Sequence, residues 1–320
     1  MRDKHSAMIG DDLVGSSDTL VARSVRGVAR QVDWAWLVAL YMGFSSAGAG
    51  AYVVWQVAGM LEPSWVVAGR AGAAVAIALV ILGASLILLD LGRWSHFYRA
   101  ASRPRASWES RGFLAILAII LLGCLQIGAW VLDLASWDRL LSVPITVLAL
   151  ALLPYGAFLL KGMRAYALWT SPLQMALVPT SGLLAGCAVL AIDPFGTLSN
   201  VHYQSLGTTL VVLAVLKALL LVALLWQTRT ASRAGRVSTQ TLLSGALARL
   251  FWAGAIGLGL ILPFFVALAV WSGLLEASVM RLAGVSALVG YLVLRYGVLA
   301  AAHRPSELTF RDSGPWGISR

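Results

Sequence analysis

Charged side chains are scarce in this sequence. Only 12% of its 320 residues are Asp, Glu, Lys or Arg, whereas 59% are hydrophobic and the mean hydropathy is +0.83. Soluble domains carry roughly a quarter charged residues, so this chain has too few to cover a surface that faces water. We therefore expect lipid to surround most of the chain. The predicted fold class is all-α, a polytopic membrane bundle of about eight transmembrane helices.

Cysteine and histidine, which commonly bind zinc, iron–sulfur clusters or haem, are also rare. The two cysteines, Cys124 and Cys187, lie in apolar runs and form no CxxC pair, and none of the four histidines lies within a predicted span. We interpret the cysteines as small buried hydrophobic residues and predict a bundle without haem or metal. Walker and GxSxG motifs are missing as well. We therefore expect no independent catalysis on a water-soluble substrate.

Eight apolar runs are long enough to cross a bilayer, which takes about 20 helical residues. They are residues 34–61, 65–91, 112–134, 139–161, 166–192, 205–227, 247–272 and 275–301. Each run is predicted to be a helix, because lipid cannot satisfy open backbone groups. Closely spaced glycines, such as Gly48 and Gly50 in the first run and Gly254 and Gly259 in the seventh, predict close helix packing.

The basic residues are predicted to lie on one side of the membrane. Most of the 24 fall in the N-terminal tail, in the loops after the second, fourth and sixth runs, and from Arg295 onward. The positive-inside rule then places both termini in the cytoplasm. The net charge of +10 is thereby interpreted as an orientation signal, and no nucleic-acid partner is expected. The chain divides into a soluble tail (1–32), a transmembrane domain (33–301) and a C-terminal tail (302–320).

Ionisable residues at membrane depth are costly and therefore indicate function. Asp90 and Arg93 lie one helical turn apart at the end of the second run, so they share a face. They form either a structural ion pair or the mouth of a site whose carboxylate accepts protons. Lys217, near the middle of the sixth run, is either a proton relay or a lysine that pairs with a carboxylate or snorkels. The remaining charges near the outer ends are expected to anchor at the headgroups: Arg70, Asp133, Asp138, Arg139, Glu276 and Arg281.

A series of short motifs extends through the apolar runs. They are Asp90-Leu-Gly-Arg93, Arg103-Pro104, Tyr155-Gly156, Trp169-Thr-Ser-Pro172, Pro179-Thr-Ser181-Gly182, Phe251-Trp252-Ala-Gly254 and Gly290-Tyr291-Leu-Val-Leu-Arg295. In order and spacing they resemble the NrfD/polysulfide-reductase type of membrane subunit, the haem-free quinone-interacting anchors of respiratory oxidoreductases. The resemblance covers roughly residues 34–300.

This resemblance implies electron exchange between membrane quinone, either ubiquinone or menaquinone, and a ferredoxin-type iron–sulfur subunit. It also implies a catalytic subunit of the molybdopterin or tungstopterin type in the same complex. Tyr155 matches the tyrosine that hydrogen-bonds a quinone carbonyl, and Asp90 matches the acidic residue near the site. Tyr41, with Ser45 and Ser46, offers polar contacts in the first span. There the sequence differs from the family in lacking histidine and asparagine.

The predicted geometry brings these candidates together. Tyr155 lies about 9 Å from the cytoplasmic end of the fourth run at about 1.5 Å per residue. Tyr41 is near the start of the first run and Asp90 ends the second. All three are expected at the cytoplasmic ends of the first four spans, so the partner subunits are predicted on the cytoplasmic face of a bacterial inner membrane.

Two other functions remain open. Lys217 and Asp90 suit a proton- or ion-translocating module, which helices broken at the membrane midplane in an internal repeat would favour. No convincing repeat of that kind is found. The missing histidine and asparagine in the first span also allow a structural anchor without a working quinone site.

Overall fold

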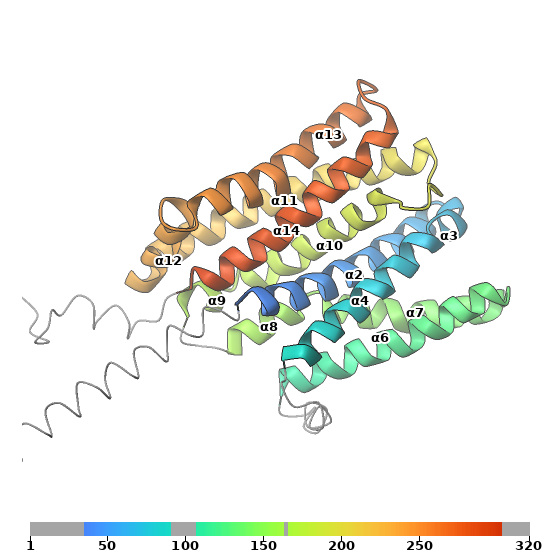
Figure 1. The fold of residues 1–320 in the computed structure, drawn as a ribbon, viewed down its shortest axis with the longest axis horizontal. Coiled ribbons are helices and arrows are strands. Elements are labelled where there is room, and N and C mark those ends of the chain that lie inside the picture. The colour runs from blue at the N-terminus through green and yellow to red at the C-terminus, as the bar shows by residue number, and fades with distance from the viewer. Residues whose placement is uncertain (1–34, 91–106, 163–165, 303–320) are drawn as a thin grey trace, which may run out of the picture.

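A computed structural model of the chain describes residues 35–90, 107–162 and 166–302. Figure 1 shows them as an elongated bundle in which the long helices run roughly side by side. Within these ranges there is no strand, and eight helical segments are long and apolar enough to cross a membrane. The prediction of an all-helical, eight-span bundle is confirmed. Arg93 and residues 1–34 and 303–320 lie outside the described residues.

The spans and their connecting helices follow one another along the chain. The spans are α2 (Ala35–Leu61), α4 (Arg70–Asp90), α6 (Trp108–Val131), α7 with α8 (Ala135–Leu152 and Tyr155–Gly162), α10 (Gln174–Ile192), α11 (Asn200–Ala231), η2 with α13 (Leu250–Ile261 and Leu262–Trp271) and α14 (Met280–Ala300). Short helices lie between them: α3 (Ser64–Ala68), α9 (Ala167–Thr170), α12 (Arg233–Leu243) and η3 (Ala277–Val279).

The second and fifth spans begin later than predicted, because short apolar helices precede them. Gly69 ends α3 before α4 begins at Arg70. Ser171 ends α9 in an extended conformation with ψ 133°, as expected for a residue that precedes a proline, here Pro172. Hydrophobicity alone merges such connecting helices with the spans that follow.

Two spans depart from regular α-helix. The fourth is interrupted at Leu153 and Pro154, so that Tyr155 is the first residue of α8. Proline lacks an N–H and disrupts the helix on its N-terminal side. The seventh span begins as a π-helix, η2, and becomes α-helical at Leu262. π-Helical turns are rare and are found frequently at functional sites.

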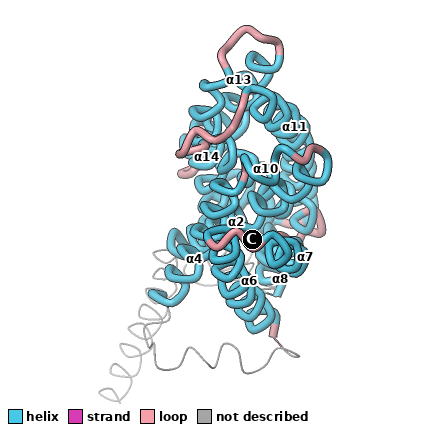
Figure 2. Tube along the Cα trace, turned by 90° about the vertical axis from the view of Figure 1, so that its right-hand side faces the viewer, coloured by secondary structure: helices cyan, strands magenta, loops and turns pink. Residues whose placement is uncertain are grey.

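The bundle has two groups of helices, which the end-on view of Figure 2 separates: α2, α4, α6 and α7 lie below α10, α11, α13 and α14. They meet where α10 and α14 pack against α2. Gly50 and Gly186 lie so close that a Cβ on either would clash with the other helix, and Gly259 and Gly290 do the same between η2 and α14. The predicted close packing at Gly50 and Gly259 is confirmed.

The two ends of the bundle carry different residues. At the end where α2 begins and α14 ends lie the basic residues Lys161, Arg229, Arg233, Arg236 and Arg249. We call it the basic end. The opposite end holds α3 and the loop between α10 and α11.

Candidate functional site

Four of the residues predicted from the sequence line one small cavity toward the basic end. Tyr41, Ser45 and Ser46 reach it from α2, and Tyr155 reaches it from α8. The other lining residues are Met42, Ile116, Leu152, Gly156 and Arg295. We call this the Tyr155 cavity. Its volume of about 10 Å³ is close to the minimum that holds one water molecule.

Tyr155 is placed in this cavity by the break in the fourth span and by a glycine on the neighbouring helix. The residue is 8% exposed. A Cβ at Gly112 on α6 would clash with the Tyr155 ring, so the ring packs directly on the α6 backbone. Among the described residues its hydroxyl has no hydrogen-bond partner. The phenol is therefore held in place by packing while its polar atom remains available.

Ser45 and Ser46 are buried without hydrogen bonds. Their side-chain oxygens have no partner among the described residues, although the two serines are only 4% and 5% exposed. Ser45 lies against Gly83 of α4, and Ser46 lies against Gly182 of α10. Serines in helices can donate to a carbonyl one turn earlier, and a buried hydroxyl left unpaired costs about 1–3 kcal/mol. Such atoms call for a water or a ligand.

Arg295 lines the cavity but was not predicted as a site residue. The sequence placed it only in the last of the short motifs and among the basic residues near the C-terminus. It is 9% exposed. Its Nε donates to the Tyr291 hydroxyl at 3.1 Å, and its guanidinium lies 5.3 Å from the centre of that ring. The signal was an arginine four residues after a tyrosine inside an apolar run, where a charge is costly.

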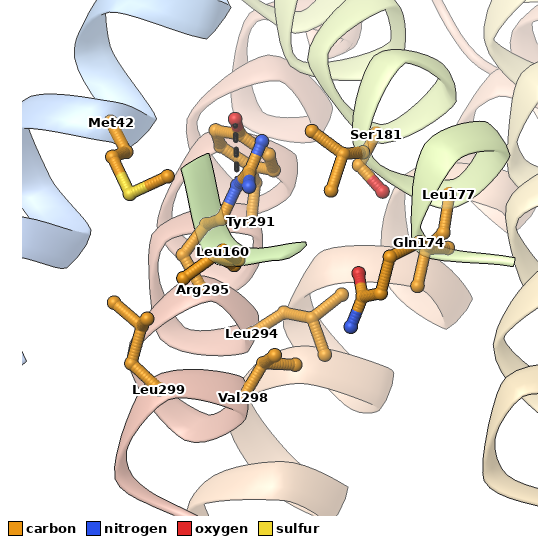
Figure 3. Close-up of a pocket in the computed structure, with 11 residues that line it drawn as sticks. Met42, Leu160, Gln174, Leu177, Ser181, Tyr291, Leu294, Arg295, Val298 and Leu299 are labelled. Atoms are coloured by element: carbon orange, nitrogen blue, oxygen red, sulfur yellow. Dashed lines mark hydrogen bonds between the residues drawn. The ribbon is translucent and has the colours of Figure 1, made fainter. Parts of the chain in front are cut away.

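Arg295 also lines a second cavity, which Figure 3 shows between α2, α10 and α14. We call it the Gln174 cavity, and its volume is about 20 Å³. Ser181 lies in its wall with a hydroxyl that no described residue pairs. Met42 and Arg295 belong to both cavities, so the two form neighbouring spaces on either side of one arginine.

Lys217 lies on α11 and lines neither of the two cavities. It is 1% exposed, so it does not snorkel. Among the described residues, its Nζ has no hydrogen-bond partner and no carboxylate pairs with it. Its electrostatic neighbour is Arg295, a second buried cation. Asp90 is the last residue of α4, but its side chain and Arg93 lie outside what the structure describes.

The opposite end contains a connected polar network. The Tyr52 hydroxyl donates to Gln126 at 2.6 Å, and the Gln126 amide donates to Asp138 at 2.8 Å. Arg70 pairs with the same carboxylate at 3.5 Å. Asp138 is 8% exposed, so the prediction that it anchors at the headgroups is wrong. The adjacent Gln126 supplies the donor that makes its burial tolerable.

A second network surrounds Asp193 in the loop between α10 and α11. Its carboxylate accepts hydrogen bonds from the N–H groups of Thr197 and Leu198 and from the Thr197 and Tyr203 hydroxyls. Arg281 donates to the Tyr203 hydroxyl at 3.2 Å and lies 3.9 Å from Asp193. Burial acts to raise the pKa of Asp193, but these hydrogen bonds outweigh it and hold the pKa below its ordinary value.

His202 also belongs to this end, in the first turn of α11, which begins five residues before the predicted sixth run. One ring nitrogen accepts from the Ser199 N–H at 3.0 Å, and the other lies 2.9 Å from the Ser64 hydroxyl. One nitrogen therefore caps the start of α11, and the other joins α11 to α3. In the described part of the chain, no group of three His, Cys, Asp or Glu side chains is placed to hold a metal ion.

Comparison with known proteins assigns the chain to a family. The family model described as "Polysulphide reductase, NrfD" matches residues 24–304. The C subunit of polysulfide reductase from Wolinella succinogenes is 29% identical over 302 residues, which cover 84% of this chain and 94% of that protein. The residues matched by the family model include all eight spans. This chain is thus a multi-pass membrane protein that belongs to the NrfD polysulphide reductase family.

Proposed function

We propose that this protein exchanges electrons between the quinone pool and an iron–sulfur subunit of a membrane-bound oxidoreductase, with the Tyr155 cavity as its quinone headgroup site. The observation that carries this proposal is the convergence of polar groups from three spans on one apolar space. Tyr155, Ser45 and Ser46 each present a hydroxyl without a described partner. Family membership supports the role, because the relative is a polysulfide reductase subunit.

The residues of the cavity suit the chemistry of a quinone headgroup. When bound, a quinone supplies two-electron, two-proton redox chemistry. The Tyr155 hydroxyl is available to donate a hydrogen bond to one carbonyl oxygen, and the serine hydroxyls are available to another. Arg295 places a positive charge in the wall, which favours negative charge developing on an oxygen nearby. Met42, Ile116 and Leu152 supply the apolar part of the wall.

The headgroup requires the cavity to enlarge. Ligand sites commonly measure about 300–1,000 Å³, far more than the about 10 Å³ between these side chains. Met42 lines both the Tyr155 and the Gln174 cavity, and methionine is an adaptable side chain. We propose that its movement joins the two spaces around Arg295 when quinone enters.

Replacing Tyr155 tests this proposal. In the purified complex, Tyr155→Phe is expected to reduce quinol-linked turnover at least tenfold, because it removes one hydrogen bond and nothing else. Reduction of artificial dyes by the partner subunits should stay at the wild-type rate. Tyr296→Phe is the matched control, since Tyr296 follows Tyr291 on α14 but lines neither cavity. Unchanged quinol turnover in Tyr155→Phe would contradict the proposal.

The partner subunits are proposed to dock on the basic end, in the cytoplasm. The Tyr155 cavity lies toward that end, and the basic loops favour the cytoplasmic side. In a Cys124→Ala background, Ser244→Cys at the basic end should resist a membrane-impermeant thiol reagent in intact cells, and Ser136→Cys at the opposite end should react. Both positions are exposed. The reverse labelling pattern would place the partners in the periplasm.

A second candidate function is proton translocation through Lys217. Its buried amino group without a described hydrogen-bond partner is the observation that favours it, since such groups occur in proton relays. Lys217→Met should then abolish acidification coupled to quinol turnover while the turnover itself continues. Coupled proton movement at the wild-type ratio in this variant would leave Lys217 with a packing role.

A further inference from the structure

A wide groove opens between α11, α12 and η2, and none of its lining residues belongs to the Tyr155 cavity. Its walls include Trp226 and Arg229 of α11, Thr239 of α12, and Phe251, Trp252 and Ile256 of η2. Its volume is about 400 Å³, within the range of small-molecule sites. We call it the α12 groove. Trp226 and Trp252 are 72% and 54% exposed, so the groove faces the lipid.

One buried polar side chain in the wall of this groove lacks a hydrogen-bond partner among the described residues. Thr239 is 1% exposed, and its side-chain oxygen makes no hydrogen bond there. Its neighbour Thr241 on α12 instead donates to the Val237 carbonyl at 2.9 Å. An unpaired hydroxyl in an apolar groove is costly, because the surrounding lipid contains no water that could bond it. Thr239 therefore indicates an occupant with an acceptor oxygen at this depth.

Three arginines lie in or near the wall of the α12 groove. Arg229 lies in the groove wall, Arg236 is one turn before Thr239 on α12, and Arg249 precedes η2 directly. All three are exposed. None of the three makes an ion pair within the described ranges. The occupant therefore combines apolar chains with a negatively charged head.

The helix that closes the groove is fixed against its neighbours. Ser232 caps α12 by accepting from the Gly235 N–H at 3.0 Å, and Trp252 of η2 donates to the Leu243 carbonyl at 2.9 Å. The buried face of α12 includes Ala234, Ser238 and Leu242, whereas Arg233 and Arg236 are exposed. This pattern is that of a helix lying at the headgroup level of a membrane.

We propose that the α12 groove binds an anionic phospholipid. An acyl chain lies against Trp226, Phe251 and Ile256, an oxygen of the glycerol–phosphate region accepts from Thr239, and the negative headgroup meets Arg229. A quinone is the poorer occupant, because its neutral headgroup offers no charge to the arginines. The proposal is independent of the quinone site, since the groove shares no residue with either cavity around Arg295.

Lipid retention tests the proposal. The purified complex is reconstituted in nanodiscs of phosphatidylcholine alone and of equal parts phosphatidylcholine and phosphatidylglycerol, then released for native mass spectrometry. Wild type should retain phosphatidylglycerol and melt several degrees higher in the mixed discs. Arg229→Gln should retain at least tenfold less, and Arg139→Gln at the opposite end, the same loss of charge, should behave as wild type.

Thr239→Val separates lipid binding from folding. Removing an unpaired buried hydroxyl should leave the melting temperature in pure phosphatidylcholine unchanged or higher, while the increment due to phosphatidylglycerol shrinks. Three results would overturn the proposal. They are equal retention of phosphatidylcholine by the wild type, wild-type retention of phosphatidylglycerol by both groove variants, and recovery of an isoprenoid quinone in place of the phospholipid.

Discussion

The two ends of the bundle differ in how far their buried polar groups are paired. At the opposite end, the carboxylates of Asp138 and Asp193 are paired with protein donors. The unpaired buried polar atoms described there are the Arg70 Nε and the Trp130 indole nitrogen. Toward the basic end and in the core between, the described residues with unpaired buried polar atoms are Ser45, Ser46, Ser181, Lys217 and Thr239.

This difference separates structural from functional polarity. Carboxylates that are paired with protein donors stabilise the fold, whereas unpaired polar groups cost stability until a ligand or water bonds them. The opposite end is therefore expected to control folding, and the Tyr155 cavity to control activity. Substitutions at the opposite end should therefore change stability, and substitutions at the Tyr155 cavity should change quinol-linked turnover.

The largest effect is expected at Asp193. Asp193→Ala leaves the N–H groups of Thr197 and Leu198 and the Tyr203 hydroxyl without their acceptor, and should reduce the free energy of unfolding by about 3–5 kcal/mol. Asp133→Ala is the control, because Asp133 also has a positive φ but accepts no side-chain hydrogen bond in the described structure. Its cost should be about 1 kcal/mol. If thermal unfolding showed equal losses of stability in the two variants, the hydrogen bonds to Asp193 would not stabilise the fold.

A smaller effect is expected at Gly112, and it should fall on activity as well as stability. A Cβ there clashes with the Tyr155 ring, so Gly112→Ala should displace the phenol, cost about 1–3 kcal/mol and reduce quinol-linked turnover. On the same helix, a Cβ at Gly128 meets nothing within 4 Å. Gly128→Ala should leave turnover intact and stabilise the helix by up to about 1 kcal/mol. Identical turnover in the two variants would argue against a role for Tyr155 in quinol oxidation or quinone reduction.

Acid should weaken the opposite end first. The pKa of Asp193 lies below its ordinary value of 3.8, so its carboxylate stabilises the folded state above that value and loses this contribution as the pH falls through the folded pKa. The melting temperature of the wild type should exceed that of Asp193→Asn by a constant amount above about pH 5. The gap should narrow as the pH drops below about 4. A gap independent of pH would contradict the assignment.

The smallest effect is expected at the cavity serines, where substitution should increase the stability of the protein instead of decreasing it. In the quinone-free protein, Ser45→Ala and Ser46→Ala remove unpaired hydroxyls and should each raise the free energy of unfolding by up to about 1 kcal/mol, while the KM for quinol increases. Ser286→Ala should instead lose stability slightly, because the Ser286 hydroxyl donates to the Ala283 carbonyl at 3.0 Å. Destabilisation by the two cavity substitutions would mean that these hydroxyls are already satisfied.

The sequence was sufficient to predict the eight spans, because length and hydrophobicity alone determine what can cross a bilayer. It also predicted Tyr41 and Tyr155 at the same end of the bundle, because positions along antiparallel spans fix depth, and both line one cavity. The third residue predicted there, Asp90, has its side chain outside the described residues. The prediction that the cavity residues bind quinone stays a prediction until it is tested as described above.

What the sequence could not provide depends on contacts between distant segments. Arg295 reaches the Tyr155 cavity only because α14 packs on α2, and no pattern within its own run indicates that partner. Asp138 was expected at the membrane surface because its hydrogen bond from Gln126 joins two helices and cannot be seen in either helix alone. The break at Pro154 was not predicted, because the hydrophobic run continues across it and conceals the new helix start at Tyr155.

Quinone occupancy tests the central claim most directly. Quinone is extracted and quantified from the complex purified as wild type, as the Tyr155→Phe/Arg295→Gln double variant, and as Tyr52→Phe, which weakens the network at the opposite end. We expect near-equal quinone in the wild type and in Tyr52→Phe, with a lower melting temperature in the latter, and strong depletion in the double variant. Full quinone occupancy in a folded double variant would contradict the assignment of the Tyr155 cavity.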